Sequence, residues 1–167
     1  YRRQRQMGIR ASRRRDAVLA RQHGSAQTVV DCGVRHDFAP APGLVIRKIA
    51  PGTQDSSQGP AMSAAQCAQA LANGIELVKA LPGNALLLGE MGIGNTSAAS
   101  LLVARLGGID VAEVTGAGTG LDAAGIARKT AVLRQALAAN AAAAAPLDAL
   151  AALDGFEIAT LSGAVLQ

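Results

Sequence analysis

The chain has 167 residues, of which 50% are hydrophobic, 2% aromatic and 17% charged. This length suits one domain, and the aliphatic composition can bury a core, which excludes a wholly disordered chain. Two cysteines, Cys32 and Cys67, are too few for a disulfide-stapled secreted module, and we expect both to be small core residues. No apolar run reaches the roughly 18–20 residues of a membrane span, and none follows the basic start as in a signal peptide. We therefore expect a cytoplasmic protein without a membrane partner.

The formal charge of +4 is unevenly distributed along the chain. Seven of the 16 basic residues are arginines within residues 1–15, so the remainder of the chain is mildly acidic. An arginine-rich arm can contact nucleic acid or an acidic surface. No aromatic residues alternate with the arginines as stacking platforms, however, so we favour a solvated arm or helix over residues 1–16 and do not expect nucleic acid as a partner.

The first third of the chain predicts one helix and little other regular structure. Residues 16–22 continue a helix that Gly24 ends, and residues 28–34 are typical of a buried strand. Residues 35–62 hold four prolines and three glycines, which makes them the least regular part of the sequence. A short apolar piece at 44–46 interrupts this region.

A helix and a strand are predicted next. Ser63 and Gln66 have the spacing of a capping box, which begins a helix that runs to about Ala80 and ends at Pro82-Gly83. The apolar residues 85–88 predict a strand that leads directly into a glycine-rich loop at 89–96.

The same order of strand, glycine loop and helix then recurs. A helix over 97–106 is followed by an apolar piece at 111–114, a second glycine loop at 115–120 and a helix that Asp122 caps and that runs through residue 139. The alanine run 141–145 favours helix until Pro146 breaks it, and a last helical stretch over 147–166 is interrupted at Gly155. This order predicts an α/β fold with an open, mostly parallel, Rossmann-like sheet flanked by helices.

The first glycine loop has the spacing G-x-x-x-x-G-x-T of a phosphate-binding loop, but Asn95 stands where the lysine of that motif belongs. Without the lysine, backbone N–H groups and a helix N-terminus remain, and these suit one compact anion such as a monophosphate. Glu90 would repel a polyphosphate, so we expect it to face a sugar hydroxyl or a ring nitrogen. A strand-to-helix turn that uses glycine for its geometry alone explains the pattern equally well.

The second glycine loop and Lys129 carry a weaker signal. Gly116, Gly118 and Gly120 lack the small residue that would complete a dinucleotide fingerprint, because Leu121 stands in its place. Taken alone, this loop favours a structural turn and Lys129 favours a solvated helix lysine. Both loops nevertheless precede helices, on the side of the sheet where α/β folds bind ligands, and Lys129 could supply the positive charge that the first loop lacks.

No other residue type forms a convincing constellation. His23 and His36 have no Cys, Asp or Glu partners at metal-ligand spacing, so neither is a convincing zinc ligand. The acids Asp31, Asp37, Glu76 and Glu157 are dispersed, and spacing assigns no acid–base pair. No serine has a recognisable base partner.

Both glycine loops together resemble the nicotinate-nucleotide–dimethylbenzimidazole phosphoribosyltransferase family. The resemblance rests on Gly-Glu-Met-Gly-Ile-Gly-Asn-Thr at 89–96 and on Thr-Gly-Ala-Gly-Thr-Gly-Leu-Asp at 115–122 with Lys129. Val-Val-Asp-Cys-Gly-Val at 29–34 and Gly-Phe-Glu-Ile-Ala at 155–159 agree with it, and it extends from about residue 17 to the end of the chain.

The resemblance implies phosphoribosyl transfer from nicotinate mononucleotide to 5,6-dimethylbenzimidazole, which gives α-ribazole 5′-phosphate and nicotinate in cobalamin biosynthesis. It also implies a parallel α/β fold, a cytoplasmic homodimer and no metal or cofactor. The donor carries a single phosphate, as the lysine-less first loop favours. The residues that the resemblance places against the nucleotide's phosphate and ribose are Glu90, Met91, Gly92, Ile93, Gly94, Asn95, Thr96, Gly118 and Lys129.

The sequence departs from the family in length and in its catalytic base. Family members are roughly twice as long, so we expect residues 17–167 to be the central part of the α/β domain of a fragment or truncated member. No residue matches the family's general-base glutamate; Glu90 is the one catalytic candidate. The chain alone should then bind nucleotide weakly and turn over little. Two alternatives are a non-catalytic nucleotide-binding or regulatory fragment, and an interaction module that uses the basic arm.

Overall fold

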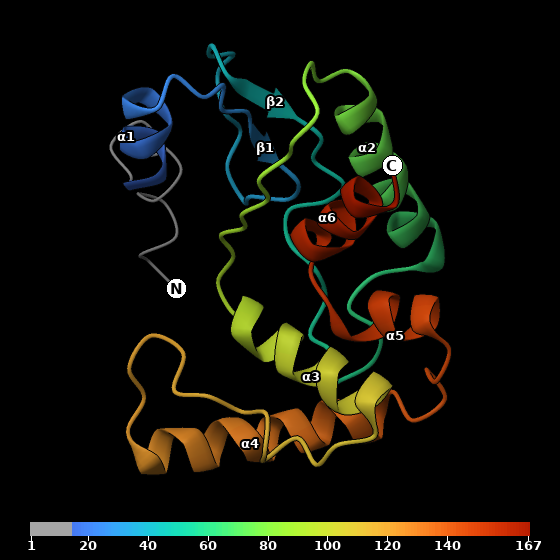
Figure 1. Ribbon diagram of the computed structural model, residues 1–167. Helices are drawn as coiled ribbons and strands as arrows, with labels where there is room; N and C mark the ends of the chain where they lie inside the picture. The colour runs from blue at the N-terminus through green and yellow to red at the C-terminus, as the bar shows by residue number, and fades with distance from the viewer. Residues whose placement is uncertain (1–14) are drawn as a thin grey trace. The chain divides into compact units, whose positions relative to one another are not determined.

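The computed structural model describes residues 15–167, and the expectations for residues 1–14 lie outside them. The chain divides into two compact units with their boundary between Gly52 and Thr53. In the described residues no helix is long and apolar enough to cross a membrane. We describe each unit separately (Figure 1).

From residue 15 onward, the first unit contains one helix and a two-stranded parallel sheet. Helix α1 spans Arg15–Gln22, and strands β1 (Val29–Asp31) and β2 (Leu44–Ile46) pair in register from Val29 opposite Leu44 to Asp31 opposite Ile46. The predictions of a helix before Gly24 and of a strand within 28–34 are therefore confirmed, and the apolar piece at 44–46 is the second strand. The connection between the parallel strands carries no helix.

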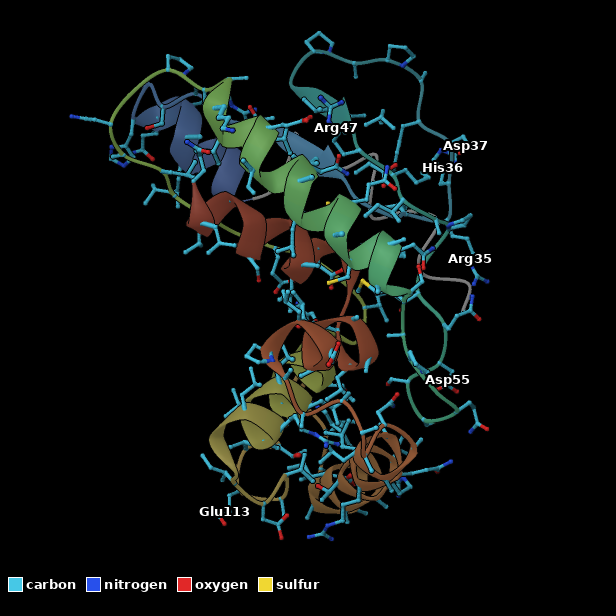
Figure 2. The ribbon with its side chains drawn as sticks, turned by 90° about the vertical axis from the view of Figure 1, so that its right-hand side faces the viewer. Arg35, His36, Asp37, Arg47, Asp55 and Glu113 are labelled. Carbon is cyan, nitrogen blue, oxygen red and sulfur yellow. The ribbon has the colours of Figure 1, made fainter. Side chains whose placement is uncertain are left out.

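Asp31, at the end of β1, organises the turn that follows this strand. Its Oδ1 accepts the backbone N–H groups of Gly33 at 3.0 Å and Val34 at 2.8 Å, and its Oδ2 lies 3.5 Å from Lys48 Nζ. Lys48 also donates to Asp37 Oδ1 at 2.8 Å, and Figure 2 shows Asp37 on the segment that joins the two strands. Lys48 lowers the pKa of Asp37, first through this hydrogen bond and then through its charge.

The second unit is formed from helices. These are α2 (Ala64–Lys79), α3 (Asn95–Gly107), α4 (Ala123–Ala139), α5 (Pro146–Leu153) and α6 (Phe156–Leu166). The Ser63–Gln66 capping box is present in both directions, and the Asp122 side chain accepts the Gly125 N–H at 2.7 Å. Both predicted helix starts are thus confirmed, because a cap is a local interaction that spans only three residues.

Two packing centres hold this unit together. Helices α2 and α6 lie side by side (Figure 1), and glycines allow their backbones to approach closely. Helices α3 and α4 pack together around a second, aliphatic cluster to which α5 contributes. This cluster consists of Leu101, Ala104, Val111, Leu133, Ala136, Ala152 and Leu153. Cys67 of α2 is buried, as is Cys32 in the first unit, which confirms both as core residues.

The α/β class with parallel strand pairing is confirmed, but two predicted strands and one helical run were wrong. Residues 85–88 form no strand, and Leu87 is 94% exposed. Residues 111–114 form turns in which Asp110 accepts the N–H groups of Ala112 and Glu113, both at 2.9 Å. An apolar run becomes a strand only when a neighbouring strand satisfies its backbone groups, and the described residues provide none here.

Residues 141–145 form turns and irregular backbone rather than helix, and Pro146 begins α5 instead of only ending a run. Proline is favoured at the first helical position because its missing N–H has no helical partner there. The interruption at Gly155 is confirmed: this residue is the N-cap of α6.

Candidate functional site

The first glycine loop ends at the N-terminus of α3. Gly94 is the N-cap residue with φ at 91°, and its carbonyl oxygen accepts the N–H groups of Ser97 at 2.8 Å and Ala98 at 3.2 Å. No side chain caps this helix end. A left-handed N-cap glycine leaves the backbone of the loop open to a ligand, and the helix dipole favours an anion at this position.

Asn95 is occupied by bonds within its own loop. Its Oδ1 accepts the N–H of Thr96 at 2.7 Å, and its Nδ2 donates to Glu90 Oε1. Asn95, which stands where a nucleoside-triphosphate loop has its lysine, therefore connects the two ends of this loop by hydrogen bonds. Glu90 is thereby held at the surface with its carboxylate close to the loop.

Lys129 connects the two glycine loops. It lies on α4, and its Nζ donates to Thr96 Oγ1 at 3.1 Å and to the carbonyl oxygen of Gly116 at 3.3 Å. Gly118 has φ at 57°, and a Cβ there would lie 3.3 Å from Thr96 Oγ1 and 3.8 Å from Lys129 Nζ. Glycine is required at this position both by the left-handed backbone and by the close approach of Thr96.

The remaining loop positions differ in their surroundings. Met91 and Ile93 are exposed apolar side chains, at 57% and 66%. Gly92 faces inward, because a Cβ placed on it would lie 2.7 Å from Oε1 of Glu157. The structure thus brings Thr96, Gly118 and Lys129 together, whereas Met91 and Ile93 extend away from the protein.

Two acids lie beside the first glycine loop; sequence reasoning did not single out Asp154 and treated Glu157 as one of several dispersed acids without an assigned role. Asp154 is only 2% exposed, and Glu157 lies in the first turn of α6 with its carboxylate against Gly92. Burial, with the nearby charges of Glu157 and Glu90, raises the pKa of Asp154 to about 7. Burial also raises the pKa of Glu157, again with a contribution from Glu90.

The sequence did contain a signal for this pair. Asp148, Asp154 and Glu157 are the three acids of a mostly apolar stretch over 147–166, and a carboxylate in such a stretch is costly to bury unless it has a specific role.

The histidines do not assemble a site. His23 and His36 are exposed, and the His36 ring packs edge-on against Phe38 with 4.9 Å between ring centres. Within residues 15–167, no group of three or more histidine, cysteine, aspartate or glutamate side chains is arranged to hold a metal ion.

Comparisons with known proteins identify the family of this chain. A family model described as "Phosphoribosyltransferase" matches residues 5–167. The chain is 72% identical over 151 residues to the nicotinate-nucleotide–dimethylbenzimidazole phosphoribosyltransferase of Variovorax paradoxus (strain S110), covering 90% of this chain and 43% of that protein. Identity to the protein of the same name from Aromatoleum aromaticum is 56%, over 89% of this chain and 44% of that protein.

A solved structure shows the same similarity in three dimensions. The crystal structure of CobT from Thermus thermophilus superposes with a TM-score of 0.87 at 37% sequence identity, covering 98% of this chain and 50% of that chain. The chain therefore spans slightly less than half the length of the relatives named above, and half of the solved chain.

Proposed function

The chain belongs to the nicotinate-nucleotide–dimethylbenzimidazole phosphoribosyltransferase family, and from this premise we propose that it binds the mononucleotide donor of that reaction. In the reaction, the phosphoribosyl group of nicotinate mononucleotide passes to 5,6-dimethylbenzimidazole and yields α-ribazole 5′-phosphate and nicotinate, a step in cobalamin biosynthesis. The bond from C1′ to the nicotinate nitrogen breaks, and a bond from C1′ to a benzimidazole nitrogen forms. We assign to this chain the residues that hold the donor.

The position of Lys129 carries this proposal. Its ammonium group bridges Thr96 of the first loop and Gly116 of the second, so one positive charge stands where two glycine loops meet. Backbone N–H groups at the start of α3 and a single lysine suit one phosphate group, because together they offer less positive charge than a triphosphate requires. A mononucleotide matches this arrangement.

Glu90 is assigned to the sugar of the donor. Its exposed carboxylate is held by Asn95 at the edge of the same loop, and a carboxylate accepts hydrogen bonds from the hydroxyls of a ribose. The phosphate would therefore lie at Thr96, Gly118 and Lys129, where the two glycine loops meet, and the ribose would lie near Glu90 in the first loop. The benzimidazole proton must leave during the transfer, and we assign no residue of this chain to its removal.

We also propose that the whole protein works as a homodimer in the cytoplasm, as the family resemblance implies. The exposed apolar side chains of Leu86, Leu87 and Leu88 support burial of this segment in a larger assembly, since contiguous exposed apolar surface is typical of interaction sites. Light scattering during size-exclusion chromatography measures the oligomeric state, and a strictly monomeric full-length protein would contradict this part of the proposal.

Titration of the chain with nicotinate mononucleotide tests the donor site. In Lys129→Met, the loss of a charge-assisted hydrogen bond of about 1.5–3 kcal/mol should weaken the affinity about tenfold to hundredfold. Lys79→Met is the matched control, because Lys79 is an exposed lysine in the last turn of α2, and its affinity should equal that of the wild type. Unchanged affinity in a folded Lys129→Met variant would show that the phosphate does not bind at this lysine.

A further inference from the structure

Glu157 is seated between two glycines. A Cβ placed on Gly92 would lie 2.7 Å from its Oε1 and 3.1 Å from its Cδ, and a Cβ placed on Gly155 would lie 2.6 Å from the same Cδ. A side chain on either residue would therefore displace the carboxylate. The carboxylate joins the first turn of α6 to the first glycine loop, which lies far earlier in the chain.

This contact explains why residue 92 is glycine. Its φ lies outside the left-handed region, in contrast to Gly94, so the backbone conformation alone does not require a glycine there. The requirement comes from the carboxylate of Glu157, which occupies the space that a Cβ would take. Gly92 and Glu157 therefore act as a pair, and the position of the loop backbone depends on the position of this carboxylate.

Further titratable groups face the same place. Glu90 approaches from the glycine loop, and Asp154 approaches from the turn before α6. Asp154 Oδ1 accepts the Gly155 N–H at 2.7 Å, whereas its buried Oδ2 has no hydrogen-bond partner among the described residues. On the α2 side, the buried thiol of Cys67 is close enough for the charge of Asp154 to raise its pKa, in addition to the effect of burial. None of these groups is a cation.

Asp154 and Glu157 ionise with difficulty, because burial disfavours their charged forms and the charge of Glu90 adds repulsion. Burial and this repulsion raise the pKa values of Asp154 and Glu157. Near neutral pH, Asp154 accordingly retains part of a proton that an isolated carboxylate would have lost.

We propose that Glu157 is a positioning residue of the first glycine loop. Its carboxylate holds Gly92 in place, and its negative charge, together with those of Asp154 and Glu90, tunes the affinity of the loop for a phosphate. The proposal rests on the proposed function, because the phosphate belongs to the mononucleotide donor. A neutral Glu157 keeps the loop in place without opposing an anion, whereas an ionised Glu157 adds a negative charge beneath the backbone that is to receive the phosphate.

The variant Glu157→Gln separates shape from charge, because glutamine retains the size of the side chain and stays neutral at every pH. In a titration with nicotinate mononucleotide between about pH 5.5 and pH 8.5, the affinities of wild type and variant should converge toward the acid end. At the alkaline end the variant should bind about threefold to tenfold more tightly than the wild type. The ratio of the two affinities cancels the ionisation of the ligand itself. Glu76→Gln, on α2 and away from the loop, is the matched control and should follow the wild type.

A ligand-free measurement distinguishes failure of this inference from failure of the proposed function. The backbone amide NMR signal of Gly92 should shift with pH in the wild type, and this shift should be clearly smaller in Glu157→Gln, where Asp154 still titrates. If nicotinate mononucleotide does not bind the wild type, the proposed function fails, and the Gly92 titration still tests the contact. A Gly92 signal that is independent of pH in the wild type, or an affinity ratio that is constant across the pH range, would overturn the proposal.

Discussion

The close packing of α2 against α6 predicts that adding a side chain at their contact lowers the free energy of unfolding. Gly74 of α2 packs against the backbone of α6, and Gly163 of α6 packs against the backbone at Leu71 of α2. In the Gly74→Ala variant, the new Cβ would lie 2.7 Å from the backbone nitrogen of Ala164 and closer still to the carbonyl oxygen of Thr160. Both obstacles are backbone atoms, so no side chain can rotate away to make room.

The expected cost follows from the separation that the helices would need. Ordinary contact of a Cβ begins at 3.4 Å, so the two helices must move apart by at least about 0.7 Å at the crossing. A gap of this size forfeits about a quarter to a half of the dispersion energy of the contacts on either side. We therefore expect Gly74→Ala to lower the free energy of unfolding by about 3 kcal/mol, at the upper end of the range for overpacked cores.

Helix propensity alone predicts that Gly74→Ala raises the free energy of unfolding, so the sign of the measured change decides between the two effects. Replacing a glycine inside a helix by alanine stabilises it by about 1 kcal/mol when nothing clashes. The matched control Ala72→Gly, at an exposed position of α2, measures this propensity in the same helix and should cost about 1 kcal/mol. Urea unfolding followed by far-UV circular dichroism suits a chain that has one tyrosine and no tryptophan. A Gly74→Ala variant that unfolds at higher urea than the wild type would refute the close approach of the two backbones.

Two further predictions concern the site. Gly118→Ala forces an L-residue into a left-handed conformation and brings its Cβ to 3.3 Å from Thr96 Oγ1. The substitution should therefore lower the free energy of unfolding by about 1–2 kcal/mol and weaken the binding of nicotinate mononucleotide. An unchanged dissociation constant in calorimetry would contradict this prediction. Asp154 has a pKa of about 7 in the folded protein, against a reference value of 3.8 for the unfolded chain. Between these pH values the folded state binds more protons than the unfolded state. The free energy of unfolding must therefore fall as the pH rises from about 4 to about 7. The free energy of unfolding falls by at most about 4 kcal/mol over this range. Asp154→Asn should flatten the dependence of the urea midpoint on pH. An equally steep profile in the variant would show that another group titrates.

Sequence reasoning located most of the helices because their boundaries are set by local interactions. The Ser63–Gln66 box, the Asp122 cap and the break at Gly155 each act over one helical turn, and all three recur in the structure. The first glycine loop was recognised by its spacing, and the compact anion that this spacing suggests as a ligand stays a prediction. Hydrogen bonds within one helical turn join residues that are close together in the sequence, so they can be predicted without knowing how the rest of the chain packs.

The strands predicted at 85–88 and 111–114 did not form, because strand formation depends on residues elsewhere in the chain. An apolar run of four residues has no local partner for its backbone groups, so its conformation is decided by whether another strand lies beside it. Residues 85–88 form no strand, and Leu87 is 94% exposed, so no strand of the described residues pairs with this run.

The sequence by itself determined the helix caps, the two glycine loops and the family. Only the tertiary structure decided which charges meet at those loops. Lys129 reaches Thr96 across 33 residues, and Glu157 reaches Gly92 because α6 returns to the start of α3. Spacing along a chain cannot show that an acid from an apolar helix lies against a glycine of a distant loop, since only the packing of the helices sets that distance. The same packing removes Asp154 from water and so sets its pKa.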